Sequence, residues 1–191
     1  MQKIIRHFVL SLLLTSCFAE NKKVIETKNN AIIQLVTSES LKIDSRGLSK
    51  STALLKTVHG NFIIKFYPKK APHTVTRVLS LIQRGFYDGL TFHRVIDKFV
   101  AQTGDPTGLG SGGTGSKLKA EFNDVQHIRG TMAMARDNTN NDSADSQFYI
   151  ALSTLPHLDK KYTVFAQIVE GLDLLERIQR GDKVLSFSLN D

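Results

Sequence analysis

The sequence contains no tryptophan and only one cysteine, Cys17, among its 191 residues. A lone cysteine allows no intramolecular disulfide in a monomer, so a disulfide framework is excluded. Without tryptophan, the 11 phenylalanines supply most of the aromatic side chains available to a core. Hydrophobic residues make up 41% and charged residues 23% of the chain, which are ordinary globular values. The length favours one domain with tails.

The patterns of metal, nucleophile and calcium sites are also missing. The histidines show no metal-ligand spacing, and no second cysteine could join them. No serine lies in a G-x-S-x-G elbow, so a nucleophilic triad is poorly supported. The Asp- and Asn-rich run 137–145 fails the EF-hand pattern, because Asp142 stands where glycine is required and Phe148 where the bidentate glutamate belongs. We therefore expect no metal ion and no other cofactor.

Nucleotide and nucleic-acid binding are not expected either. The loop Gly108–Gly113 matches G-x-G-x-x-G, but Thr114–Lys117 continues the loop where a dinucleotide site needs a helix to open. The formal net charge is +7, yet the basic residues are scattered and form no long basic run. A mild positive charge favours solubility and loose contact with anionic surfaces.

Residues 1–19 have the pattern of a secretory signal peptide. Lys3 and Arg6 form a basic start, and Phe8–Leu14 is an apolar run shorter than the ~20 residues that span a bilayer. Leu14–Cys17 resembles a bacterial lipobox, which implies cleavage before Cys17 and lipid attachment to its thiol. Ordinary cleavage after Ala19 is the alternative. We expect an exported, periplasmic protein that is anchored to a membrane through Cys17.

Residues 20–52 are polar and mixed, and they are predicted to form a tether between the signal peptide and a domain at 53–191. Ala31–Val36 is apolar enough for a short strand or for a segment packed on the domain, and the sequence leaves both open.

The domain region reads as many short strands and two helices. Asn61–Tyr67 alternates in polarity, and Leu54–Val58 is its predicted hairpin partner. Further strands are expected at the start of 92–113 and at 130–135, 146–150, 162–169 and 184–189. One helix should begin at Pro72 and end at Gly85, with Val75, Val78, Leu79 and Ile82 forming one apolar stripe. A second, short helix should follow Gly171.

No βαβ alternation appears, which argues against a parallel sheet. The economical architecture is a mainly β domain, an antiparallel barrel with the helices as caps.

The stretch Phe92–Gly113 carries the clearest pattern. It begins with FHRVI, which places Phe92, Arg94 and Ile96 on one strand face and His93 on the other, where a hydrogen-bonded interior histidine is expected. Together with F-V-x-Q-x-GDPTG, SQFYI at 146–150 and HLDKKYTVFAQIVEG at 157–171, it resembles the cyclophilin family of peptidyl-prolyl cis-trans isomerases. The resemblance covers about Ala53–Leu189. It implies a closed eight-stranded antiparallel β-barrel capped by two α-helices, with a site on its outer face.

The resemblance also implies site residues. Arg94 is similar to the catalytic arginine, and Gln102 to the amide that holds the substrate backbone and orients it. Ala135, Arg136 and Gln147 resemble the groove for residues before the proline. The walls of the proline pocket are implied to be Phe99, Val100, Tyr149, Leu158 and Tyr162. How Phe99 and Val100 both reach the pocket is not explained by strand alternation and needs a local irregularity.

The implied activity is rotation about X-Pro bonds in exported proline-containing polypeptides by a monomer, which would assist their folding. Asp97-Lys98, Val100 and His157 depart from the residues that the family often has, which leaves cyclosporin sensitivity open. Two other functions stay open: a module that binds proline segments with little turnover, and a scaffolding lipoprotein.

Overall fold

The computed structural model describes residues 52–190. The predicted signal peptide, the predicted lipid attachment at Cys17, the tether up to residue 51 and the open question about Ala31–Val36 lie outside the described residues.

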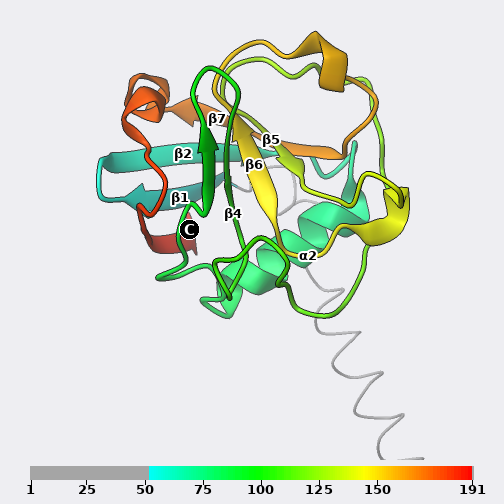
Figure 1. Ribbon diagram of the computed structural model, residues 1–191, viewed down its shortest axis with the longest axis horizontal. Coiled ribbons are helices and arrows are strands. Elements are labelled where there is room, and N and C mark those ends of the chain that lie inside the picture. The colour runs from blue at the N-terminus through cyan, green and yellow to red at the C-terminus, as the bar shows by residue number, and fades with distance from the viewer. Residues whose placement is uncertain (1–51, 191) are drawn as a thin grey trace, which may run out of the picture. The chain divides into compact units, whose positions relative to one another are not determined.

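Eight antiparallel strands form one curled sheet (Figure 1). Their order across the sheet is β3-β4-β6-β5-β7-β2-β1-β8, and each neighbouring pair is antiparallel, which confirms the predicted strand direction. The strands are β1 (Thr52–Thr57), β2 (Gly60–Phe66), β3 (Arg94–Ile96), β4 (Val100–Thr103), β5 (Thr131–Met134), β6 (Phe148–Ala151), β7 (Val164–Glu170) and β8 (Val184–Leu189).

β1 and β2 form the predicted hairpin. Leu55 pairs with Phe62, and the turn between the strands ends at Gly60, whose φ of 133° is readily adopted only by glycine. The alternation seen in the sequence is the reason that β2 is a strand, because it turns every second side chain toward the core. Those side chains are all buried: Phe62, Ile64 and Phe66.

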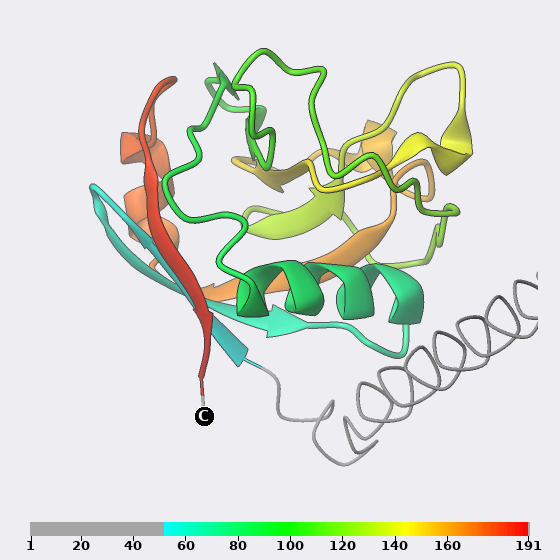
Figure 2. The same cartoon turned by 90° about the horizontal axis from the view of Figure 1, so that it is seen from below.

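Helix α2 (Pro72–Gln83) is the first predicted helix, and Figure 2 shows it running along one side of the sheet, where it contacts β7 and β8. Its N-terminal backbone lacks a cap from its own sequence. Glu121, from a distant loop, supplies one by accepting hydrogen bonds from the backbone N–H groups of His73 at 3.0 Å and Thr74 at 2.8 Å. The predicted apolar stripe is buried: Val75, Val78, Leu79 and Ile82.

The second predicted α-helix is a 3-10 helix instead, η3 (Leu172–Arg177). It has 6 residues, of which only Leu175 is buried. A segment this short forms too few i→i+4 hydrogen bonds to offset the nucleation of an α-helix. The two other short helices are also 3-10: η1 (Asn141–Ser143) and η2 (Pro156–Leu158).

The prediction of a fully closed barrel is wrong at one seam. β3 and β8 lie at the two ends of the sheet and form no ladder with each other in the described part of the chain. The two segments that lead into β3 and β8 pair with each other just before these strands begin. There Thr91 and Lys183 form a bridge, and the Phe92 N–H donates to the Asp182 carbonyl at 2.8 Å. Beside this bridge the chain turns at Gly181, which has a φ of 95° and donates its N–H to the Phe92 carbonyl at 3.0 Å. Within residues 52–190 the pairing therefore ends before β3 begins.

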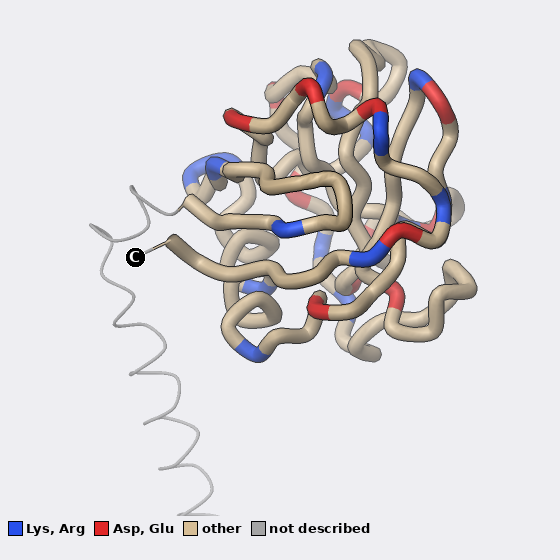
Figure 3. The backbone as a smooth tube through the Cα atoms, turned by 90° about the vertical axis from the view of Figure 1, so that its left-hand side faces the viewer, with Lys and Arg blue, Asp and Glu red and all other residues tan. Residues whose placement is uncertain are grey.

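Basic and acidic residues are interspersed along the chain (Figure 3). No helix within residues 52–190 is long and apolar enough to cross a bilayer.

Candidate active site

The β3–β4 hairpin places Arg94 directly opposite Gln102. The Arg94 Nη1 group donates a hydrogen bond to Gln102 Oε1 at 3.2 Å. The guanidinium carbon also lies 5.8 Å from the centre of the Phe99 ring. Arg94 is solvent-exposed, so its remaining N–H groups can reach a bound molecule.

A chain of amides continues from Arg94 into the glycine-rich loop. Gln102 Nε2 donates to Gln147 Oε1 at 2.9 Å, and Gln147 Nε2 donates to the carbonyls of Gly110 at 3.0 Å and Gly112 at 2.8 Å. Both hydrogens of the Gln147 amide are used in this way. The position of the guanidinium is therefore linked, through two side chains, to a backbone loop.

The buried carboxylate of Asp105 holds that loop in place. It accepts hydrogen bonds from the backbone N–H groups of Thr107 at 2.7 Å and Gly112 at 3.1 Å, from the Gly110 N–H and from the Thr107 hydroxyl. Burial alone would raise the pKa of Asp105, but these hydrogen bonds outweigh it and lower the pKa to about 2. The glycine-rich loop thus supports the site, as an ionised carboxylate organises its backbone.

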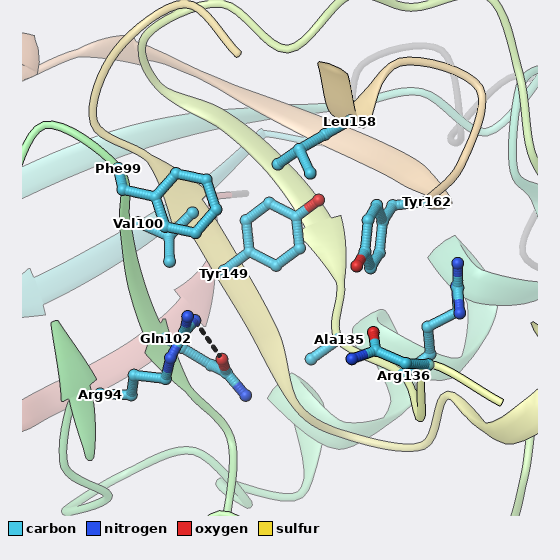
Figure 4. A pocket seen from close by; sticks show the side chains of 10 residues that line it. Arg94, Phe99, Val100, Gln102, Ala135, Arg136, Tyr149, Leu158 and Tyr162 are labelled. Carbon is cyan, nitrogen blue, oxygen red and sulfur yellow. Dashed lines mark hydrogen bonds between the residues drawn. The ribbon is translucent and has the colours of Figure 1, made fainter. Parts of the chain in front are cut away.

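Beside Arg94 lies a cavity of about 290 Å³ (Figure 4). We call it the apolar cavity after its aromatic and aliphatic walls, although polar side chains also line it: Arg94, Gln102, Arg136 and Asn138. Tyr149 forms its floor and meets Tyr162 edge-on, with ring centres 5.6 Å apart and planes at 84°. Tyr162 stands just before β7, not within the strand predicted from residue 162. The structure brings nine of the ten sequence-predicted residues to this one cavity: Arg94, Phe99, Val100, Gln102, Ala135, Arg136, Tyr149, Leu158 and Tyr162.

The irregularity that the sequence analysis required is the turn between β3 and β4. Lys98 adopts a left-handed conformation with φ 55°, and the Phe99 N–H donates back to the Ile96 carbonyl at 3.0 Å. Phe99 therefore precedes the regular strand, and Val100 begins it. This break in alternation explains how two consecutive side chains line one cavity.

Gln147, the tenth predicted residue, lines a neighbouring cavity of about 470 Å³ that also contacts Gln102, Ala135 and Arg136. Arg136 stands at the border of the two cavities. Its guanidinium carbon lies 4.7 Å from the Tyr162 ring centre, and its Nε donates to the Lys161 carbonyl at 3.2 Å. Gln102, Ala135 and Arg136 line both cavities, so the two form one groove.

Sequence reasoning missed several residues at the groove, and two of them adjoin the apolar cavity. Asn138 lines the apolar cavity from a polar loop that carries no distinguishing pattern. His127 lies behind Tyr149, with its Nε2 atom 2.9 Å from the Tyr149 hydroxyl. A lone histidine between strands gives no signal in one sequence, because its partners are distant in the chain.

The expectation for His93 is half right. The ring is buried, but neither of its nitrogens finds a hydrogen-bond partner within residues 52–190. Burial lowers its pKa, and Arg94 lowers it further, whereas Asp105 opposes this. The strand alternation placed the ring correctly, but it does not place partners around it. Within the described residues no three His, Cys, Asp or Glu side chains cluster as a metal site would require.

A fixed guanidinium beside an apolar, aromatic-lined groove on the outside of a curled antiparallel sheet defines a peptide-binding site with one permanent hydrogen-bond donor. Residues 52–187 match the sequence model of the family described as cyclophilin type peptidyl-prolyl cis-trans isomerase/CLD. The chain belongs to the cyclophilin-type peptidyl-prolyl cis-trans isomerase family.

Individual relatives agree. A peptidyl-prolyl cis-trans isomerase of Synechococcus elongatus is 42% identical over 139 residues, which cover 72% of this chain and 94% of the relative. One of Helicobacter pylori is 41% identical over 153 residues, 78% of this chain and 93% of the relative. A crystal structure of a Cryptosporidium parvum cyclophilin-type isomerase, in the presence of the dipeptide Ala-Pro, superposes with a TM-score of 0.69 at 25% identity and covers 73% of this chain and 99% of that one.

Proposed function

We propose that this protein accelerates cis-trans rotation about X-Pro bonds in exported polypeptides and so assists their folding, with Arg94 as its catalytic residue. The observation that carries the proposal is the guanidinium held by Gln102 at the edge of an apolar groove. Membership of the isomerase family supports the same reaction.

Catalysis of this reaction requires stabilisation of a twisted peptide bond. Rotation about a peptide bond has a barrier of about 18–20 kcal/mol, because amide resonance is lost at the twisted geometry. The proline nitrogen becomes pyramidal there and regains a lone pair, which can accept a hydrogen bond. A donor that meets this lone pair only in the twisted state lowers the barrier without tightening ground-state binding. The guanidinium of Arg94 offers several N–H donors in a rigid, planar arrangement and suits this task.

The other groove residues are proposed to bind the substrate. The proline ring is proposed to rest on Tyr149 and Val100, between Phe99, Leu158 and Tyr162. Gln102 keeps one amide N–H beyond its hydrogen bond to Gln147, and this N–H can hold a client carbonyl. Ala135, Arg136 and Gln147 extend the groove toward the residues before the proline. The reaction as proposed involves no covalent intermediate.

The test compares Arg94→Ala with wild type in a protease-coupled assay of an Ala-Pro peptide. A hydrogen bond to a charged group contributes about 1.5–3 kcal/mol, so turnover should fall roughly 10- to 150-fold while peptide affinity changes little. Arg84→Ala is the matched control, because the exposed Arg84 side chain, just after α2, donates to the Ser80 hydroxyl and lines neither cavity. Equal turnover in wild type and Arg94→Ala would refute the assignment.

Peptide affinity measured on the same samples separates the alternatives. A wild-type protein that binds the peptide but does not speed its isomerisation is a proline-binding module. A deletion strain whose defect is fully corrected by Arg94→Ala points to a scaffolding lipoprotein.

We further propose that the protein is exported as a monomer and held at the periplasmic side of a membrane by a lipid on Cys17. The lipobox-like Leu14–Cys17 supports this, and it gives the one cysteine a function. A single acyl chain anchors weakly, so several chains on Cys17 would be needed for firm attachment. Cells fed a fatty-acid probe should label wild type and not Cys17→Ser. Equal, poor labelling of both would leave ordinary cleavage after Ala19 as the explanation.

A further inference from the structure

Behind the floor of the apolar cavity lies a chain of three polar side chains, of which Tyr149 and His127 are buried and Asp159 is partly exposed. The Tyr149 hydroxyl is 2.9 Å from His127 Nε2, and His127 Nδ1 is 2.9 Å from Asp159 Oδ1. The same carboxylate oxygen also accepts from the His127 backbone N–H at 2.7 Å. His127 is completely buried, and Tyr149 is 5% exposed. The two aromatic rings lie nearly parallel, with centres 6.0 Å apart.

The direction of each hydrogen bond follows from the charges. The hydrogen bond from the His127 backbone N–H lowers the pKa of Asp159, so the carboxylate is ionised and can only accept. Burial lowers the pKa of His127, which keeps the ring neutral at pH 7. The single ring proton therefore belongs on Nδ1, facing Asp159, and Nε2 is an acceptor. It follows that the Tyr149 hydroxyl donates to His127, away from the groove.

We propose that His127 is a positioning residue for the proline pocket: by accepting the Tyr149 hydroxyl hydrogen, it fixes the ring on which the proline rests and keeps the pocket floor apolar. Asp159 holds His127 in the tautomer that this requires. The role of the pocket rests on the proposed isomerase function, whereas the hydrogen-bond arrangement does not depend on it.

The consequence of losing His127 is predictable. A buried hydroxyl that has no acceptor is unfavourable, so the Tyr149 ring should shift until its hydroxyl reaches water or the groove. The groove would then present a polar group where the proline ring binds. Arg94 lines the same cavity as Tyr149, but its side-chain hydrogen bond goes to Gln102 and not to any of these three side chains within residues 52–190. Substrate binding should therefore weaken more than the rotation step.

A double-mutant cycle tests this coupling. In the mature protein, His127→Leu should raise KM for an Ala-Pro peptide roughly 3- to 10-fold, the range of a neutral hydrogen bond, with kcat within about twofold of wild type. In a Tyr149→Phe background, the same change should raise KM no further, because the hydroxyl through which His127 acts is gone. His127→Gln, which offers an amide oxygen as acceptor, should recover part of the affinity. An equal rise of KM in both backgrounds would overturn the proposal.

His59→Leu is the matched control. His59 also pairs with a carboxylate, Asp182, at 2.6 Å, but neither residue lines the groove. This variant should leave KM unchanged. A rise similar to that of His127→Leu would show that the loss of any histidine–carboxylate pair loosens the domain, and this would overturn a specific role for His127.

A direct measurement works even if His127→Leu does not fold. In ¹⁵N NMR spectra of wild type, His127 Nδ1 should carry the proton and Nε2 should not, and Tyr149→Phe should shift the Nε2 resonance. A proton on Nε2 at pH 7 would overturn the proposal. Affinity for the peptide, measured by titration, replaces KM if turnover is absent. The Arg94→Ala assay tests the isomerase function, whereas the His127 tautomer and the peptide affinity test the role of His127. The two hypotheses can therefore fail independently.

Discussion

The two faces of β6 are equally buried but serve different purposes. Phe148 and Ile150 face the sheet interior, where the Phe148 ring lies 5.4 Å from Tyr87 and 5.9 Å from Phe165. Tyr149 and Ala151 face outward into an apolar cluster that is covered by the groove walls. Burial alone therefore does not separate a structural side chain from a functional one. The neighbouring residues make the distinction, because the inner face is covered by packed side chains and the outer face borders a cavity.

The largest expected effect on stability comes from removing a packed side chain from the inner face. Phe148→Ala should lower the free energy of unfolding by about 3–5 kcal/mol, because it leaves a cavity among packed aromatic rings. Denaturant unfolding measures this, with isomerase activity per folded molecule as the companion reading. A strong loss of activity in the folded fraction would mean that the two faces are not independent.

The next effect concerns the loop that supports the outer face. Asp105→Asn should lower stability by about 2 kcal/mol at pH 7, since the charged acceptor of the loop N–H groups is lost. The folded-state pKa of Asp105 is lowered to about 2, so its stabilisation is present above the ordinary carboxyl pKa and is lost as the pH falls toward 2. Unfolding curves from pH 7 to pH 2 should show the difference between wild type and variant shrinking with acid.

Asp137→Asn is the control for that series. Asp137 makes the same contacts to a threonine two residues ahead, Thr139, but it is exposed and has no glycine loop to hold. A pH-dependent loss as large as that of Asp105→Asn would contradict the role given to the loop.

A smaller effect is expected for the amide chain on the outer face. Gln147→Leu removes the link between Gln102 and the glycine loop, so the Arg94 guanidinium becomes less well oriented. A neutral hydrogen bond contributes about 1 kcal/mol, so turnover should fall roughly fivefold. Gln167→Leu is a useful comparison, because Gln167 bonds to the Arg129 carbonyl away from the groove. Equal losses of turnover would argue against a role for the chain in orienting Arg94.

The smallest effect on stability is expected at the turn that brings Phe99 to the outer face. Lys98 has a left-handed φ of 55°, which is unfavourable for any residue with a Cβ atom. Lys98→Gly should raise the free energy of unfolding by about 0.5–1 kcal/mol, since part of the relief is offset by the greater freedom of glycine in the unfolded chain. Lys161→Gly, at a position without positive φ, should destabilise. Thermal unfolding of the two variants checks the sign.

Much of the fold was predictable because its signals are local. The stripe of α2 and the alternation of β2 repeat every few residues, so they can be read directly in the sequence. The seam between β3 and β8 was not predictable, because it depends on a turn at Gly181 that meets Phe92, just before β3, only in the folded chain. The 3-10 form of η3 was missed for a similar reason, as the number of residues it can pack depends on its neighbours.

The candidate site divides in the same way. The sequence by itself determined the residue types: one arginine on a strand, an amide eight residues later, aromatic side chains and a lone cysteine near the N-terminus. Only the tertiary structure decided that Gln147 joins Gln102 across 45 residues, and that Asp159 and His127 stand behind Tyr149. Alternation fixes the face to which a side chain points. A hydrogen bond also requires a partner within about 3 Å, and that partner comes from strands which only folding brings together.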